Sequence, residues 1–360
     1  MNASTLAAGL RTFETPEATY RERLEIAART VAGEHEAPVA ALVVGSTALR
    51  RCSARADLDI VIIPGPERPY ERHAGPERPY ERDAGPERFS TQVVDGVRVE
   101  VERMGRRRAL ACTEGDGWVW ELREAARLGC GVPLVDPSGF GAELADRAAA
   151  MRPRRARVEA TLSDVYRVLV AMARAEPDPE ALRGCLDNLA LLALLERPRR
   201  YQKPKWALAD LLHAGEHGLV DALLAAYGCD AGPALDGARA IIATTYEIAG
   251  VPSHETILAM GHAPRYAEAS YVSRCLDDAD DLAASGRTVE ARYVALFTAR
   301  LAAGLLRGTK SVAGTFADRG GDELARRYLA LFEGAAPAPE VVEVALAAAD
   351  ARRARLERPA

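Results

Sequence analysis

The chain has 360 residues, of which 48% are hydrophobic and 28% charged, and its formal net charge at pH 7 is −5. This length suits two domains, or one large one, and the composition is that of an ordinary globular protein. The negative charge argues against a nucleic-acid partner, whose phosphates favour basic surfaces, and is compatible with a cationic small molecule.

The cysteine pattern and the apolar runs indicate the compartment. The six cysteines are scattered and include no C-x-x-C pair, which is typical of reduced thiols. The N-terminal residues show no basic segment followed by a long apolar one, so we expect no secretion signal. No run approaches the roughly 20 apolar residues that span a bilayer. We therefore expect a soluble, cytoplasmic protein that does not enter a membrane.

The first elements alternate between helix and strand patterns. Residues 16–33 have the spacing of an amphipathic helix, and VAALVVG at 39–45 is typical of a buried strand. TALRRCSA at 47–54 can form a short helix. DLDIVII at 57–63 is a second strand, rich in β-branched residues.

A tandem repeat of ten residues follows this strand. GPERPYERHA at 65–74 is repeated as GPERPYERDA at 75–84 and begins a third time at 85–89. The repeat lacks the apolar residues that a stacked solenoid needs. Proline with balanced glutamate and arginine indicates an extended, solvated insertion loop over 65–88. A lid or an arm that contacts the acceptor is the alternative.

The end of the first half returns to strand and helix patterns. Residues 89–104 predict a hairpin with a two-residue turn at Asp95-Gly96. Its second strand alternates valine with charged residues, so one face is apolar and the other charged. A helix is expected at 117–130, and a short strand, a turn and a helix start at 131–144.

From about residue 151 helical periodicity replaces the strand patterns. Val158, Leu162 and Val165 begin a run of apolar residues at helical spacing. Further helices are predicted at 178–196, 205–227, 234–248, 264–284, 288–308, 321–333 and 338–357. The predicted fold class is α+β: a small mixed-sheet domain at residues 1–150, followed by an all-α helical domain at 151–360.

Two aspartates stand in the second strand, where buried apolar residues are expected. Asp57 and Asp59 face the same side of that strand, about 7 Å apart. Such carboxylates repel each other unless a cation lies beside them, and oxygen ligands without His or Cys suit Mg²⁺. Upstream, Gly45 would let the backbone approach a phosphate group, and the Ser46 hydroxyl can donate to it.

Gly45-Ser46, followed eleven residues later by D-x-D on a strand, resembles the nucleotidyltransferase superfamily of the DNA polymerase β type. The closest likeness is to small-molecule enzymes such as the aminoglycoside adenylyltransferases. Members carry a third carboxylate on a later strand, for which Glu100 fits best and Glu102 is the alternative. LVDPSGF at 134–140 is similar to a strand-turn near the end of that domain.

The chain also departs from the family pattern. Many members have a further glycine before the Gly-Ser pair, a glycine four residues after the serine, and a serine before the first aspartate. Val44, Arg50 and Ala56 occupy these positions here. The departures concern the phosphate loop and leave the metal ligands intact.

The resemblance implies the reaction and its cofactors. A hydroxyl of a small molecule attacks the α-phosphorus of ATP or another nucleoside triphosphate, and pyrophosphate is released. Asp57 and Asp59 would hold two Mg²⁺ ions, and Glu100 would complete the second metal site or act as general base. Lys203 and Lys205 would reach the triphosphate from the helical domain. Alternatively, they belong to a solvated helix start, with the neighbouring tryptophan in the domain core.

Other constellations are weaker. His213 and His217 are four residues apart but lack a third ligand, and the aspartates of 276–282 are typical of a solvated helix face, although they could bind a polycationic acceptor. No P-loop motif is present.

Two functional alternatives stay open: a degenerate member that binds nucleotide for a regulatory role, and a protein-modifying enzyme of the toxin-antitoxin type.

Overall fold

The computed structural model describes residues 15–34, 37–52, 56–65, 89–174, 178–197, 203–229, 234–260, 264–306, 316, 318, 321–332 and 339–357. The chain divides into two compact units. The sheet unit consists mainly of Thr12–Arg154, and the helical unit mainly of Arg155–Leu194 and Gln202–Ala360. The predicted insertion loop at 65–88 lies, apart from Gly65, outside the described residues.

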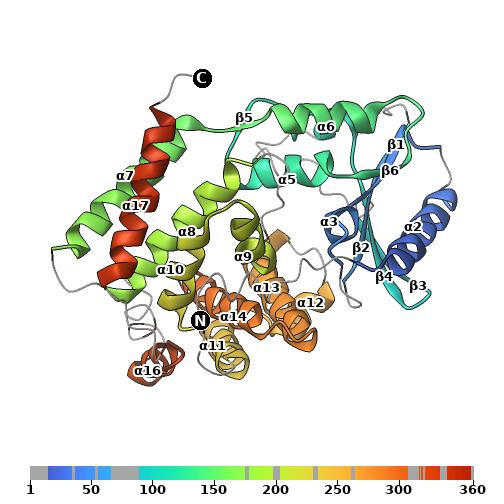
Figure 1. The fold of residues 1–360 in the computed structure, drawn as a ribbon. Coiled ribbons are helices and arrows are strands. Elements are labelled where there is room, and N and C mark those ends of the chain that lie inside the picture. The colour runs from blue at the N-terminus through green and yellow to red at the C-terminus, as the bar shows by residue number, and fades with distance from the viewer. Residues whose placement is uncertain are drawn as a thin grey trace, which may run out of the picture. The chain divides into compact units, whose positions relative to one another are not determined.

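The sheet unit contains a mixed five-stranded sheet with helices (Figure 1). Its elements are α2 (Glu17–Ala32), β1 (Ala40–Val44), α3 (Gly45–Ala48), β2 (Leu58–Ile63), β3 (Phe89–Val94), β4 (Val97–Arg103), α4 (Arg106–Ala111), β5 (Asp116–Gly117), α5 (Val119–Gly129), β6 (Val132–Val135), α6 (Phe140–Ala150) and β7 (Arg152–Pro153). The strand order is β3-β4-β2-β1-β6. β4 runs parallel to β2, and the other neighbouring pairs of this sheet are antiparallel.

Helices cover both faces of the central strands. Ile26 and Val31 of α2 pack on one face against Ile60 and other alternate residues of β1, β2 and β4. On the other face, Leu128 of α5 and Phe140 of α6 pack against the intervening residues of β1 and β2. The two-residue period of a strand therefore decides which helices each side chain meets.

The predicted hairpin is confirmed and sets the register of β4. Asp95 and Gly96 have φ angles of 52° and 79°, the left-handed pair that a two-residue turn of this type requires. β3 and β4 pair around this turn, and β4 then pairs with β2 on its other edge. The turn thereby fixes the register of β4 against β3.

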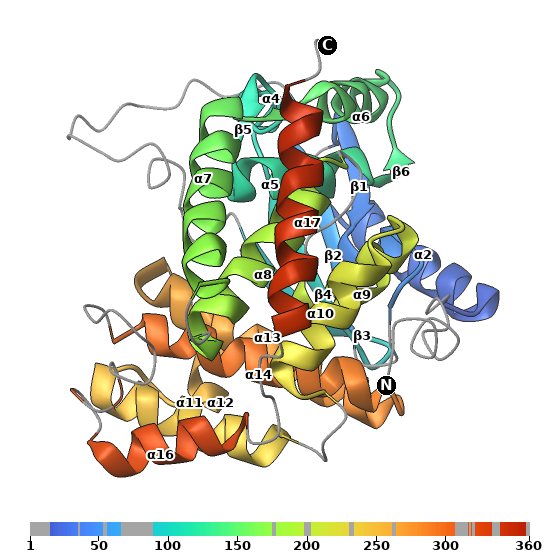
Figure 2. The same ribbon diagram turned by 60° about the vertical axis from the view of Figure 1, so that its left-hand side comes forward.

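Every secondary-structure element in the described part of the helical unit is a helix. They are α7 (Arg155–Met172), α8 (Pro179–Leu195), α9 (Pro204–His213), α10 (His217–Tyr227), α11 (Leu235–Ala249), α12 (His254–Met260), η1 (Pro264–Tyr266), α13 (Ala267–Ala284), α14 (Thr288–Gly304), α16 (Asp322–Ala330) and α17 (Pro339–Leu356). α7 and α17 lie side by side (Figure 2). Arg155 at the start of α7 donates to the carbonyl of Leu356 at the end of α17, so the two helices run antiparallel. No helix in the described part of either unit is long and apolar enough to cross a membrane.

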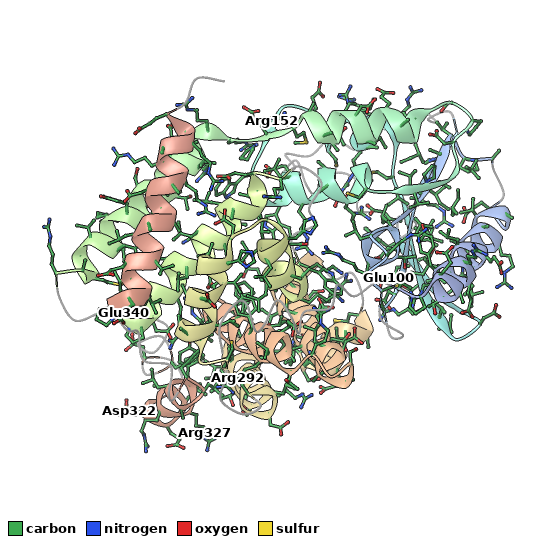
Figure 3. The ribbon with its side chains drawn as sticks, viewed as in Figure 1. Glu100, Arg152, Arg292, Asp322, Arg327 and Glu340 are labelled. Carbon is green, nitrogen blue, oxygen red and sulfur yellow. The ribbon has the colours of Figure 1, made fainter. Side chains whose placement is uncertain are left out.

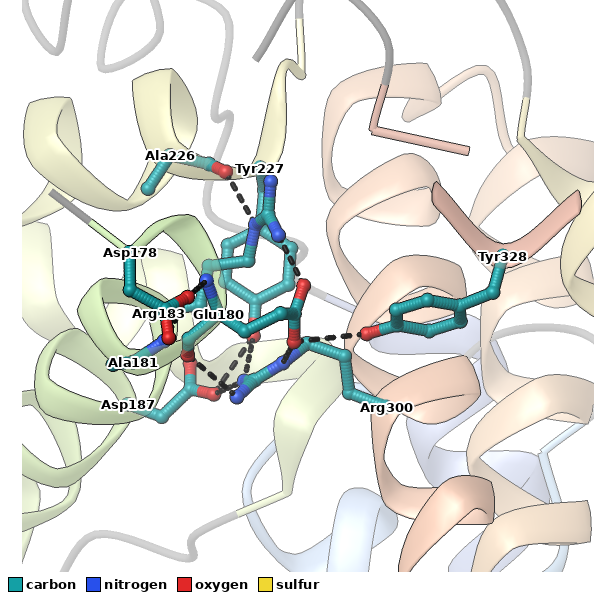
Figure 4. Close-up of polar contacts among 9 residues, drawn as sticks. All are labelled: Asp178, Glu180, Ala181, Arg183, Asp187, Ala226, Tyr227, Arg300 and Tyr328. Atoms are coloured by element: carbon teal, nitrogen blue, oxygen red, sulfur yellow. Dashed lines mark hydrogen bonds and ion pairs between the residues drawn. The ribbon is translucent and has the colours of Figure 1, made fainter. Parts of the chain in front are cut away.

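A buried polar network joins four helices of this unit (Figure 4). Glu180 and Asp187 of α8 both pair with Arg300 of α14. Tyr227 of α10 donates to Asp187 at 2.7 Å, and Tyr328 of α16 donates to Glu180 at 3.1 Å. These contacts satisfy charges that would otherwise be costly inside a protein.

Some predicted elements need correction. The single helix expected at 205–227 is two helices, α9 and α10, because Gly215 between them takes a φ of +79° that ends the first one. The helix expected at 47–54 begins earlier, at Gly45, and ends at Ala48. The short helices α4 and α12 were not predicted.

Candidate functional site

The candidate site lies where β2 and β4 run side by side. Asp57 immediately precedes β2, and Asp59 is its second residue. In the parallel pairing Asp59 lies opposite Glu100 of β4. Glu100 is labelled in Figure 3. Their neighbours Leu58 and Val99 point into the core beneath α2, so Asp59 and Glu100 share the opposite face. Strand pairing therefore brings two of the three predicted acids next to each other.

Gly45 connects the Gly-Ser turn directly to Asp59. Val44, the last residue of β1, pairs with Asp59, and Gly45 follows with a φ of +68°. A Cβ atom on Gly45 would lie 2.3 Å from the Oδ2 atom of Asp59, which is too close for any other residue. Glycine at this position thus lets the Asp59 carboxylate pack directly against the turn, where another residue would place its Cβ atom.

The residues after Gly45 are buried polar groups. Ser46 and Thr47 are both buried in the first turn of α3. Among the described residues, the Oγ1 atom of Thr47 has no hydrogen-bond partner. Buried hydroxyls are normally satisfied, so this turn holds an unused polar atom two residues from the glycine.

Arg98 lies between Asp57 and Glu100. Its Nη2 atom donates to Oε1 of Glu100 at 2.8 Å, and its Nε atom lies 3.8 Å from Oδ1 of Asp57. Arg98 and Glu100 are two residues apart on β4 and therefore share a face. The guanidinium thus bridges two of the predicted metal ligands. The alternation in VRVEVER places Arg98 on the charged face together with Glu100, but the contacts of Arg98 with these acids were not predicted.

Glu102, the alternative third acid, has a different partner. It is buried opposite Val61 and pairs with Arg127 of α5 at 2.6 Å. Arg127 also pairs with Glu124 of the same helix. Of the two candidate glutamates, Glu100 is the one that shares a partner with Asp57.

The oxygen atoms of these groups are suitable ligands for a hard divalent cation, and strand pairing places Asp59 next to Glu100. Carboxylates and a hydroxyl are oxygen ligands of the type that Mg²⁺ prefers, and the Asp59 carboxylate lies directly against the Gly45 turn. In the described part of the chain, no three His, Cys, Asp or Glu side chains are grouped so that they could hold a metal ion. A guanidinium, that of Arg98, contacts both Asp57 and Glu100.

Lys203 and Lys205 belong to the helical unit. Lys203 occupies the residue position immediately before α9 and makes no side-chain capping hydrogen bond there. Lys205 is buried and pairs with Asp278 of α13, and its ammonium lies 5.4 Å from the ring centroid of Trp206. Trp206 is itself buried, as expected for a residue of the helical core. Their predicted contact with a triphosphate stays a prediction.

The aspartates predicted as a possible polycation site have partners within the helical unit. Asp278 pairs with Lys205, and Asp280 pairs with Arg239 of α11. Two of the four negative charges are thus matched by cations of the same unit. These ion pairs argue against a site for a polycationic ligand, and Asp278, whose side chain is 16% exposed, does not belong to a solvated face.

Comparison with known proteins adds no relative. No family model and no curated protein matches the chain. The likeness to nucleotidyltransferases therefore depends on the Gly45-Ser46 turn and on the acids of β2 and β4.

Proposed function

We propose that the protein is a Mg²⁺-dependent nucleotidyltransferase that transfers AMP from ATP, or the monophosphate of another nucleoside triphosphate, to a hydroxyl of a small molecule. One observation carries the proposal. The Gly45 turn opens onto the carboxylate of Asp59, which pairs in register with Glu100 on the neighbouring strand. Phosphate transfer needs acids and an open backbone turn at one place, and these residues supply both.

Each residue has a role in this proposal. Asp57, Asp59 and Glu100 would hold the cation, which when bound supplies charge neutralisation of the triphosphate and acidifies the acceptor hydroxyl. Gly45 lets the triphosphate approach the backbone, and Ser46 donates its hydroxyl to a phosphate oxygen. Lys203 and Lys205 are the proposed cationic contacts from the helical unit, and Lys205 would first have to leave Asp278.

The reaction is a displacement at phosphorus. The acceptor oxygen forms a bond to the α-phosphorus, and the bond between that phosphorus and the oxygen bridging to the β-phosphate breaks. Pyrophosphate leaves, and the hydroxyl proton goes to Glu100 where that residue acts as general base in place of completing the second metal site. The net negative charge of the chain favours a neutral or cationic acceptor over an anionic one.

A second candidate function has its own supporting observation. Arg98 stands between Asp57 and Glu100, where a degenerate member of the family could keep a fixed ion pair. Such a protein would bind a nucleotide for a regulatory purpose and would not turn it over.

The test is pyrophosphate release from four nucleoside triphosphates with Mg²⁺ against a panel of hydroxyl-bearing small molecules. Asp59→Asn should lower turnover by about 10³-fold or more, because it removes a charged ligand from the reacting centre. Asp95→Asn is the matched control: Asp95 lies in the hairpin turn of the same unit, and asparagine tolerates its positive φ.

Retained activity in Asp59→Asn would rule out the mechanism. ATP binding without pyrophosphate release against any acceptor would favour the regulatory function instead.

A further inference from the structure

Arg98 is held at the candidate site by a hydrogen bond on one side and a charge contact on the other. Nη2 donates to Glu100, whereas the 3.8 Å separation from Asp57 is an ion contact too long for a hydrogen bond. Nε is buried, and no described residue accepts a hydrogen bond from it. A guanidinium has five N–H donors and is most stable when paired in a bidentate way. The Arg98 contacts therefore fall short of those of a fully satisfied ion pair.

Part of the Arg98 side chain is nevertheless accessible to solvent. The side chains of Arg98 and Asp57 are 39% and 37% exposed, so water can replace a guanidinium that leaves. Exposed ion pairs of this kind contribute little to stability. The position of Arg98 can therefore change without disturbing the fold of the sheet.

We propose that Arg98 is an internal counter-ion that competes with a divalent cation for Asp57 and Glu100. This inference rests on the proposed function, because the cation is the one that nucleotidyl transfer requires. A cation binds these carboxylates only when the guanidinium moves away from between them. Arg98 is thus a residue that sets the metal affinity, and it does not contact the reacting atoms.

The charges at the site explain why removal of Arg98 should strengthen the binding of a divalent cation. Two carboxylates beside a guanidinium carry a net charge of about −1, and without it they carry about −2, which attracts a divalent cation more strongly. Metal sites gain affinity with the number of charged ligands they offer. Removal of the Arg98 charge should therefore strengthen binding, which is the opposite of what loss of a structural residue would do.

The experiment measures binding of Mn²⁺ alone to the full chain without nucleotide, by isothermal titration calorimetry and by the electron paramagnetic resonance of free Mn²⁺. Arg98→Gln should bind Mn²⁺ about ten-fold tighter than the wild type, because the competing charge is gone. Arg98→Lys keeps the charge and should stay within about three-fold of the wild type.

Arg103→Gln is the matched control. Arg103 lies on the same strand with a similar exposure, 36%, but it pairs with Glu34 on the α2 side of the sheet. Its Mn²⁺ affinity should equal that of the wild type. The double variant Arg98→Gln/Glu100→Gln should lose the gain, because it removes one of the two carboxylates.

Two results would overturn the inference: an Arg98→Gln variant that binds Mn²⁺ no tighter than the wild type, or a gain that persists in the double variant. These results are separable from failure of the proposed function. Pyrophosphate release by the wild type with no gain in Arg98→Gln would refute the counter-ion role alone. A gain in Mn²⁺ affinity without pyrophosphate release from any triphosphate would refute the enzymatic function alone.

Discussion

Each unit of the protein contains an arginine that bridges two carboxylates, and the two arginines have different surroundings. Arg98 contacts Asp57 and Glu100 beside the paired strands β2 and β4, and its side chain is 39% exposed. Arg300 contacts Glu180 and Asp187 between helices, and its side chain is 13% exposed. The ion pairs have the same composition, and solvent reaches only one of them readily.

The two sites also differ in the other hydrogen bonds around the ion pairs. Asp187 accepts a hydrogen bond from Tyr227, and Glu180 accepts one from Tyr328 (Figure 4). Burial raises the pKa of both tyrosine hydroxyls well above its usual value, so each keeps its proton and donates it to a carboxylate. At the sheet site, Nε of Arg98 has no hydrogen-bond partner among the described residues.

This difference separates a structural ion pair from an exchangeable one. A buried guanidinium that pairs with two buried carboxylates cannot leave without stranding charge in the core. An exposed and incompletely bonded guanidinium can leave into water at little cost. Burial and extra donors therefore decide the role, whereas the residue types alone do not.

The largest expected effect comes from removing each arginine in turn. Arg300→Met should lower the free energy of unfolding of the helical unit by about 3–5 kcal/mol, because Asp187 stays buried without its cation and Glu180 keeps only its pair with Arg183. Arg98→Met, the matched substitution, should lower it by less than about 1 kcal/mol. Chemical denaturation followed by circular dichroism measures both values.

Equal losses in the two variants would contradict the distinction. A large loss in Arg98→Met would mean that this arginine is a structural part of the sheet unit and could not act as an exchangeable counter-ion.

Local pattern was enough to predict much of the fold. Alternation in β4 and the Asp95-Gly96 pair predicted the hairpin because both signals lie within a few residues of each other. The break at Gly215 was missed because the apolar spacing of α9 and α10 continues on both sides of it. α12, with seven residues, is too short to show a helical period.

The candidate site depended on pairing between distant segments. That Asp59 faces Glu100 follows from a parallel pairing across some forty residues, which no local pattern encodes. The ion pair of Arg98 with Glu100 is local, and strand alternation could have indicated it. The network of Arg300 was out of reach, because Glu180 lies 120 residues away in the chain.

Alkaline pH should weaken the helical unit more than the sheet unit. The pKa values of Tyr227 and Tyr328 are raised in the folded state above the value of about 10 that tyrosine has in the unfolded chain. Their contribution to the free energy of unfolding is therefore fully present below about pH 10. It is lost as the pH rises above that value, at about 1.4 kcal/mol per pH unit for each tyrosine. Denaturation between pH 9 and pH 11 measures this slope, and tyrosinate absorbance reports the titration.

Arg98→Met serves as the reference here, since it leaves both tyrosines in place and should show the wild-type slope. Tyr227→Phe/Tyr328→Phe should show a smaller slope. Ionisation of Tyr227 and Tyr328 near pH 10 in the still-folded protein would contradict their role as buried hydrogen-bond donors to Asp187 and Glu180.

The smallest expected effect is the salt dependence of the two ion pairs. A double-mutant cycle of Arg98→Gln and Glu100→Gln should give a coupling energy of about 0.2–1 kcal/mol at low ionic strength. The coupling should fall towards zero near 1 M salt, where the screening length shrinks to about 3 Å. The corresponding cycle of Arg300→Gln and Glu180→Gln should keep most of its coupling, because ions in solution do not reach between α8 and α14. A salt-insensitive Arg98 pair would mean that its charges are shielded from solvent, and Mn²⁺ could then not displace the guanidinium as the counter-ion role requires.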